Sequence, residues 1–202
     1  MFNFKDVDRS MLMKLVILHV AVIVVSNALV GIPVEIFGVK LTWAAFTFPL
    51  VVIATDLTVR LLGKQIARST IAVAYPFAIL GSIAVVMAEG APTSVALRIG
   101  FASATAYAIG TLLDVYVFQH IREKWSSNWW LAPAVSTVAA NIIDTYTFFF
   151  TAFSGSANEY MAANWMEIAG SQTILKIFVG LIIFLPAYGV LLNHLQKKYK
   201  IK

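Results

Sequence analysis

Six long apolar segments take up most of the sequence and constrain its fold more than any other feature. They cover residues 12–31, 41–62, 70–89, 94–121, 131–153 and 171–195. An α-helix needs about 20 consecutive apolar residues to cross the hydrocarbon core of a bilayer, and each segment reaches that length. Only 12% of the residues are charged, against about 25% in soluble domains. The sequence therefore predicts an all-α fold, an integral membrane bundle of six transmembrane helices that forms one domain over residues 1–202.

The distribution of Lys and Arg predicts how this bundle is oriented. Twelve of the fifteen basic residues fall on one side of the predicted membrane, at the chain ends and in short connections. These twelve are Lys5, Arg9, Lys14, Arg60, Lys64, Arg68, Arg122, Lys124, Lys197, Lys198, Lys200 and Lys202. Short loops rich in Lys and Arg stay on the cytoplasmic side, so we expect both termini to be cytoplasmic. The same scatter at helix ends indicates contact with the lipid bilayer and no nucleic-acid partner.

The fifth apolar segment carries polar residues at helical spacing. Thr137, Asn141, Asp144 and Phe148 are separated by four, three and four residues, which places them on one face of a helix. Hydrogen bonds between helices would explain Thr137 or Asn141 alone. They explain Asp144 poorly, because a buried carboxylate without a cationic partner takes up a proton. We interpret this stripe as a substrate-binding face.

A second group of charges, Asp56, Arg60 and Asp114, is expected in the inner half of the membrane. Asp56 and Arg60 lie one helical turn apart and can pair along their own helix. Asp114 lies at a similar distance from the cytoplasmic end of its segment. Two interpretations stay open and are compatible: an ion cluster that holds the second and fourth spans together, or a transport gate.

Further polar residues enter the predicted membrane from the outer side. They are Asn27, Glu167, Gln172 and Lys176. Lys176 would either contribute to the site or extend its ammonium group to the outer surface. Two prolines, Pro49 and Pro186, are expected to kink the second and sixth spans.

Small residues recur every four positions along the fourth span. Gly100, Ala104 and Ala108 form one row, and Ala102, Ala106 and Gly110 form another. Such rows let helices approach closely in lipid. We expect packing within the chain, and a homodimer through this face is the alternative.

Catalytic and metal-binding patterns are absent from the sequence. The chain has no cysteine, which excludes disulfides and thiolate sites. It contains no HExxH or GxSxG motif, and its histidines, His19, His120 and His194, fall at or near the ends of predicted spans. We expect a protein that is not an enzyme and that needs no metal or cofactor.

Several stretches resemble the bacterial queuosine precursor transporter family, also called the vitamin uptake transporter family. They are SNALVGIPVEIFG, LTWAAFTFPLVVIATDLTVRLLGK, LLDVYVFQHIR, WWLAPAVSTVAANIIDTYTFFFTAF, NWMEIAG and FLPAYGVLLN. The resemblance extends over about residues 15–195 and is most specific in ATDLTVR, in the segment from WWLAP to Asp144 and in WMEIA. It departs from the family pattern at Gln172, where relatives carry an acid, and at Ala140, where a glycine is common.

This resemblance implies a multi-pass protein of the bacterial inner membrane that imports a deazapurine. The substrate would be 7-cyano-7-deazaguanine, with 7-aminomethyl-7-deazaguanine as a second candidate, and both are precursors of a modified base of transfer RNA. Asp144 would accept the ring N–H and exocyclic amine, and Asn141, Asn27 or Gln172 would bond the carbonyl group. Aromatic rings such as Phe48, Tyr146 or Phe148 would cover the flat base, and Asp56, Glu167 and Lys176 complete the predicted substrate-binding set.

Two questions of mechanism stay open at the level of sequence. Protonation of Asp56, Asp114 or Asp144 would couple uptake to the proton gradient, whereas a passive facilitator needs no such step. The alternative function is a substrate-binding subunit of an energy-coupling vitamin transporter. Because the chain lacks a GxxxxGK[ST] loop, the ATPase of such a transporter would be a separate module.

Overall fold

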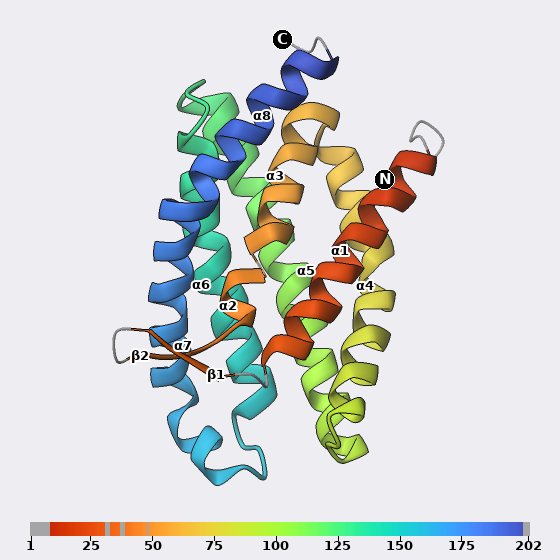
Figure 1. Cartoon of the computed structure of the whole chain (residues 1–202), viewed down its shortest axis with the longest axis vertical. Coiled ribbons are helices and arrows are strands. Elements are labelled where there is room, and N and C mark those ends of the chain that lie inside the picture. The colour runs from red at the N-terminus through yellow and green to blue at the C-terminus, as the bar shows by residue number, and fades with distance from the viewer. Residues whose placement is uncertain (1–8, 31–32, 37–38, 48, 200–202) are drawn as a thin grey trace.

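The computed structural model describes residues 9–30, 33–36, 39–47 and 49–199, which form an upright bundle of long helices (Figure 1). The helices are α1 (Arg9–Val30), α2 (Ala44–Thr47), α3 (Pro49–Leu62), α4 (Lys64–Ala88), α5 (Thr93–Lys124), α6 (Leu131–Phe153), α7 (Glu159–Val179) and α8 (Leu185–Tyr199). A π-helical turn, η2 (Gly180–Phe184), joins α7 to α8, and two strands, β1 (Pro33–Ile36) and β2 (Val39–Thr42), precede α2.

Four helical segments are long and apolar enough to cross a membrane. They are residues 9–29 of α1, all of α4, all of α5, and the continuous run 159–198 through α7, η2 and α8. The 23 residues of α6 also suffice in length, but its polar stripe makes it less apolar. The predicted multi-pass membrane protein is thus supported.

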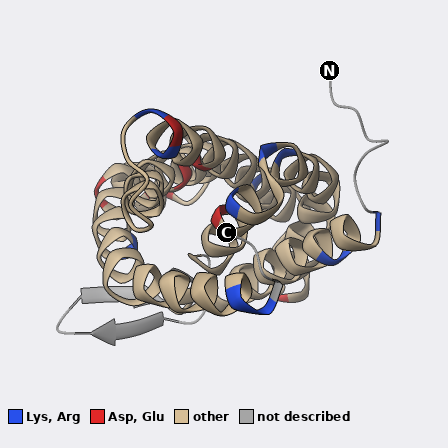
Figure 2. Cartoon of the chain, turned by 90° about the horizontal axis from the view of Figure 1, so that it is seen from above, with Lys and Arg blue, Asp and Glu red and all other residues tan. Residues whose placement is uncertain are grey.

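The start of α1 and the end of α8 lie at the same end of the bundle (Figure 1). Basic residues gather at this end because the end of α3, the start of α4 and the end of α5 also meet there (Figure 2). At the opposite end, the Arg98 guanidinium donates to the carbonyl groups of Thr151, Ser154 and Gly155. A cation at the carboxyl end of a helix is favourable, so Arg98 holds the end of α6 against α5.

The second predicted span, 41–62, is not one continuous helix. Its first residues belong to β2, which pairs antiparallel with β1 from Pro33↔Thr42 to Ile36↔Val39. The four-residue α2 follows, and α3 then begins with Pro49. Proline is tolerated in the first turn of a helix but not in its interior. Pro49 therefore starts a new helix where we expected a kink, and the predicted all-α class is confirmed apart from this short hairpin.

α3 is too short to span the membrane by itself. Its 14 residues extend about 21 Å at 1.5 Å per residue, against a hydrocarbon core of about 30 Å. The helix starts at mid-height in the bundle and rises toward the end that carries both described chain ends (Figure 1). This places the polar residues of α3 in one half of the molecule only.

The last helical segment is longer than predicted and contains a change of helix type. α7 begins at Glu159, so most of the stretch 154–170 that we expected outside the membrane is helical. At η2 the Leu185 N–H donates to the Gly180 carbonyl, five residues back. Pro186 follows directly, and it lacks the N–H that would continue an α-helical ladder. The wider turn accommodates this proline.

α5 forms the centre of the bundle between α4 and α6, and its small residues explain how. A Cβ atom added at Gly100 would collide with the Ile83 side chain of α4, and one added at Gly110 would lie 2.9 Å from the Asp144 Cβ of α6. Both small-residue rows are thus used within the chain. The alternative of a homodimer through this face is not supported.

His19 lies in the middle of α1, which corrects its predicted place near a span end. Its Nδ1 atom is 2.9 Å from the Tyr107 hydroxyl of α5, and both side chains are buried. Because Tyr107 lies on α5, the contact between the two side chains joins α1 to α5.

Candidate functional site

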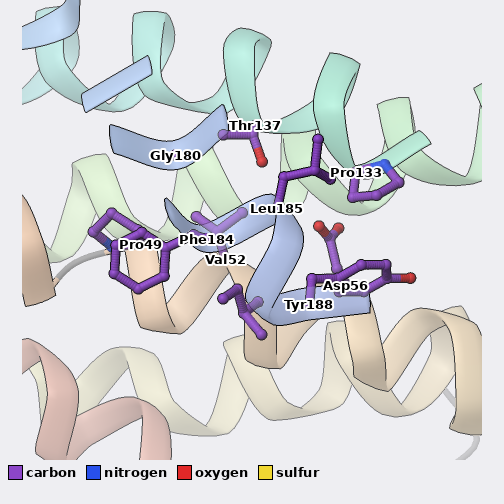
Figure 3. Close-up of a pocket in the computed structure, with 10 residues that line it drawn as sticks. Pro49, Val52, Asp56, Pro133, Thr137, Gly180, Phe184, Leu185 and Tyr188 are labelled. Carbon is purple, nitrogen blue, oxygen red and sulfur yellow. The ribbon is translucent and has the colours of Figure 1, made fainter. Parts of the chain in front are cut away.

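A small cavity lies where α3, α6 and the η2–α8 segment meet (Figure 3). It is lined by Pro49, Val52, Ile53, Asp56, Pro133, Thr137, Gly180, Phe184, Leu185 and Tyr188. Its volume of about 10 Å³ corresponds to roughly one water position. The cavity is small and mostly apolar, with Asp56, Thr137 and Tyr188 as its polar contributors.

On the wall of this cavity, Asp56 is buried beside a second carboxyl group. The Asp56 side chain of α3 accepts a hydrogen bond of 3.4 Å from Ser136 of α6. Asp114 of α5 faces both Asp56 and Ser136, yet no hydrogen bond of normal geometry ends on either of its oxygens. The structure thus brings together the two acids that we placed at similar depth.

The predicted pairing of Asp56 with Arg60 does not form. The Arg60 guanidinium acts on Asp56 only through a longer electrostatic interaction. Its Nη1 atom instead donates to the Trp129 carbonyl at 3.4 Å. Arg122 Nη1 in turn donates to the Arg60 carbonyl at 3.4 Å. The arginine therefore links α3 to the connection between α5 and α6 and closes the end of the bundle that carries both described chain ends.

Trp129 completes this closure of the bundle end by packing against α8. A Cβ atom added at Gly189 would lie 2.6 Å from its ring, so the absence of a side chain at Gly189 lets the indole approach. Tyr188, the preceding residue, is 1% exposed and lines the cavity beside Asp56 (Figure 3).

Asn141 lies one turn beyond the cavity on α6 and has an unused acceptor. Its Nδ2 atom donates to the Thr137 carbonyl at 2.9 Å, whereas its Oδ1 atom is buried and has no hydrogen-bond partner in the described residues. Gly180 covers this part of α6, since a Cβ atom there would lie 2.9 Å from Thr137 Cγ2 and 3.8 Å from Asn141 Nδ2. An unsatisfied buried amide oxygen costs free energy, so this acceptor is open to a water molecule or a ligand.

Asp144 and Lys176 form a buried ion pair between α6 and α7. Lys176 Nζ lies 3.1 Å from Asp144 Oδ2 and donates to Thr145 Oγ1 at 3.2 Å. The side chains are 15% and 6% exposed for Lys176 and Asp144. Lys176 therefore points into the bundle, and the alternative in which it extends to the outer surface is wrong. Lys176 is thus the cationic partner of Asp144 that the sequence alone did not identify.

The other predicted site residues are distributed over the molecule. Asn27 is used in helix packing, because its Nδ2 donates to Ser82 at 2.5 Å and its Oδ1 accepts from Ser103 at 3.1 Å. Phe148 packs with Phe149, its ring centroid 5.3 Å away. No contact of these residues with the cavity is present.

Two further predicted residues lie on α7, and a third is not among the described residues. Glu167 is exposed and Gln172 is half-buried on α7. Phe48 lies outside the described residues. The structure thus joins Asp56 to Asp114, places Asn141 near the cavity, and joins Asp144 to Lys176.

Sequence reasoning missed four residues of this region: Ser136, Thr145, Trp129 and Tyr188. Ser136 and Thr145 are adjacent in sequence to Thr137 and Asp144, so their positions on the helix could be predicted. Their partners, Asp56 and Lys176, lie on other helices and could not be predicted. Tyr188 could have been predicted, because it is a polar aromatic residue within an apolar span and lies two residues after Pro186.

Comparison with known proteins identifies the family. The family model described as "Putative vitamin uptake transporter" matches residues 42–191. A queuosine precursor transporter of Escherichia coli is 44% identical to this chain and is aligned over 89% of this chain and 86% of its own length. This chain belongs to the queuosine precursor transporter family.

Other members of the queuosine precursor transporter family are more distant. A probable member from Haemophilus influenzae is 36% identical, covering 89% of this chain and 86% of its own length. A probable member from Bacillus subtilis is 28% identical, covering 82% of this chain and 78% of its own length. No solved structure matches. The chain is thus a membrane transporter and not an enzyme, as the sequence predicted.

Proposed function

We propose that this chain imports a queuosine precursor, 7-cyano-7-deazaguanine, across the bacterial inner membrane. The names of its relatives support the substrate class, and the buried, unpartnered Asn141 Oδ1 beside the cavity is the observation that carries the assignment of the site. The proposed site extends along α6 from the Asp56 cavity past Asn141 to the Asp144–Lys176 pair.

The chain crosses the membrane six times in this proposal, with both termini in the cytoplasm. Four of the crossings are α1, α4, α5 and the α7–η2–α8 segment, and α6 supplies a fifth. The sixth is composite, since the short α3 and the segment before it together occupy the depth of one crossing. Support comes from the basic helix ends that share one end of the bundle with the described chain ends (Figure 2), as the positive-inside rule requires.

The chemistry of the base matches the polar groups of α6. A deazaguanine presents a ring N–H beside an exocyclic amine, and Asn141 Oδ1 and the Asp144 carboxylate both accept such donors. Lys176 balances the charge of Asp144 in the absence of substrate. A ring that lacks these donors would leave the acceptors buried and unpaired, which strongly disfavours its binding.

Substrate binding requires the bundle to open. Sites for small molecules have volumes of about 300–1,000 Å³, whereas the cavity here holds about 10 Å³. We therefore infer that this cavity enlarges when the substrate binds. The η2–α8 segment forms the wall opposite α6, and its displacement would join the cavity to Asn141.

The test is calorimetric titration of 7-cyano-7-deazaguanine into purified Asn141→Leu protein. Loss of a buried hydrogen bond of about 1–3 kcal/mol should weaken binding about 5- to 150-fold. Asn164→Leu is the matched control, because Asn164 makes the same bond to the carbonyl four residues back, to Tyr160 at 2.8 Å, but lies on the surface of α7. Equal affinities of the two folded variants would remove Asn141 from the site.

Uptake by proteoliposomes that contain this chain alone tests the alternative of a binding subunit. We expect the purified chain to move labelled base across the bilayer without a partner. Binding without any transport would instead indicate an obligate energising module.

A further inference from the structure

Asp56 and Asp114 form a carboxyl pair that the substrate site does not explain. They are 2% and 0% exposed and come from neighbouring helices, α3 and α5. Ser136 of α6 approaches both. Arg60 lies within electrostatic range of Asp56 but directs its hydrogen bond to Trp129. The mutual repulsion of two buried carboxylates without an ion-paired cation favours the binding of a proton by the pair.

We propose that Asp56 and Asp114 form a proton-binding site that couples substrate import to the proton gradient. This inference rests on the proposed function, because it assigns the coupling ion and its residues for that transport. One proton per substrate molecule enters from the outside, is held by the carboxyl pair in the closed state, and leaves to the cytoplasm when the inner end opens.

A second observation independently indicates a ligand at this place. The Tyr188 hydroxyl belongs to a different helix, is buried, and has no hydrogen-bond partner in the part of the chain that the structure describes. Tyr188 interacts electrostatically with Asp56 and Arg60 and lines the same cavity (Figure 3). The unused hydroxyl and the unused Asp114 oxygens together provide donors and acceptors for a proton and a water molecule.

The surroundings of the pair contain few other charges. The titratable groups that act on it are Arg60 from α3 and Tyr188 from α8, and Arg122 from α5 acts on Tyr188. α6 contributes the Ser136 hydroxyl. Across the described residues, α1 and α4 contribute no charged or titratable group that acts on either carboxyl. Protonation of the pair thus changes the charge of the buried region around Asp56 and Asp114, where few other charges act.

The third membrane carboxylate, Asp144, is not suited to this role. Lys176 lies 3.1 Å from it, so its negative charge is already balanced and a proton would have to displace the ammonium group. The pair at Asp56 and Asp114 has no such competitor.

The pair also lies where proton release and gate opening can be linked. Asp56 is on the cavity wall, four residues before Arg60, which holds the inner closure through Trp129. Withdrawal of the η2–α8 wall hydrates Asp56 and separates it from Tyr188. The proton then passes to cytoplasmic water, and the carboxylate that remains attracts Arg60 until the closure forms again.

The experiment uses wild-type protein in proteoliposomes loaded with a pH-sensitive dye and given labelled 7-cyano-7-deazaguanine. An acidic exterior should drive substrate accumulation of up to about tenfold per pH unit, with one proton entering per substrate. Exchange of labelled for unlabelled base, without a gradient, is measured on the same vesicles. Exchange that proceeds with no effect of the gradient and no proton entry would overturn the coupling and leave the import function intact. Absence of both binding and exchange would instead contradict the proposed function.

Asp114→Asn assigns the site, because Asp114 does not line the substrate cavity. We expect this variant to exchange substrate but to lose gradient-driven accumulation and proton entry. Glu89→Gln is the control, since it removes an exposed acid at the end of α4 and should accumulate substrate like wild type. Accumulation by Asp114→Asn at the wild-type level, or loss of exchange together with accumulation, would overturn the assignment. If this variant does not fold, Ser136→Ala replaces it and should shift the pH at which accumulation is half-maximal.

Discussion

At the scale of single residues, the ion pair between Lys176 and Asp144 is expected to contribute to the stability of the bundle. Replacing Lys176 by Met leaves a buried carboxylate beside Thr145 without its ammonium partner. Breaking a buried pair by removing one partner costs about 3–5 kcal/mol. We expect Lys176→Met to lower the thermal unfolding temperature in detergent, as measured by intrinsic fluorescence.

The matched control is the double variant Lys176→Met with Asp144→Asn, which removes both charges. Its destabilisation should be smaller than the sum of the two single effects, because contacting residues do not behave additively. Additive effects would show that the two side chains do not stabilise each other.

Spacing along one helix predicted the Asn141–Asp144 face but not the partners of its members. Lys176 is 32 positions from Asp144, and helical periodicity says nothing about which helix faces which. The same limit explains why the sequence suggested Asn27 as a ligand residue. An amide in the membrane needs hydrogen-bond partners, and only the packed bundle shows that these are Ser82 and Ser103.

At the scale of helices, the contact between α5 and α6 depends on Gly110. A Cβ atom there would lie 2.9 Å from Asp144 Cβ, so Gly110→Ala must push the two helices apart. Overpacking of this kind costs about 1–3 kcal/mol, and we expect a lower unfolding temperature. Gly170→Ala is the control, because the added methyl would meet only the Tyr146 hydroxyl at 3.4 Å. Equal unfolding temperatures of the two variants would mean that α5 and α6 can separate without cost.

The π-helical turn before Pro186 gives a second prediction at this scale. Pro186→Ala restores an N–H group and allows α-helical bonds across η2. We expect slower exchange in proteoliposomes with little change in calorimetric affinity, because the substitution stiffens the moving wall and leaves α6 intact. A loss of affinity with an unchanged exchange rate would place the effect of Pro186 in the binding site.

Periodicity and length gave the long helices correctly, but they failed between residues 33 and 62. An apolar run of helical length does not distinguish one spanning helix from a strand, a short helix and a half-length helix. Pro49 was the signal for this break, but a proline occurs both in kinked helices and at the start of new helices. The sequence alone therefore did not distinguish the two.

At the scale of the whole molecule, the orientation of the bundle can be read with single cysteines, since the chain has none. Ser127 and Ala157 are exposed in the connections on either side of α6. In intact cells a membrane-impermeant maleimide should label Ala157→Cys and not Ser127→Cys. Permeabilised cells, in which both should react, provide the control. Labelling of Ser127→Cys from outside would reverse the proposed topology.

The π-helical turn at Gly180–Phe184 allows α8 to rotate relative to α7. A π turn holds one residue more than the α-helical path, and releasing that residue would rotate α8 by about 100° and advance it by about 1.5 Å relative to α7. Tyr188 would then swing off Asp56, and Gly189 would no longer receive the Trp129 ring. A single step of helical register would thus release the contacts of Tyr188 and Gly189 while the chain stays helical throughout.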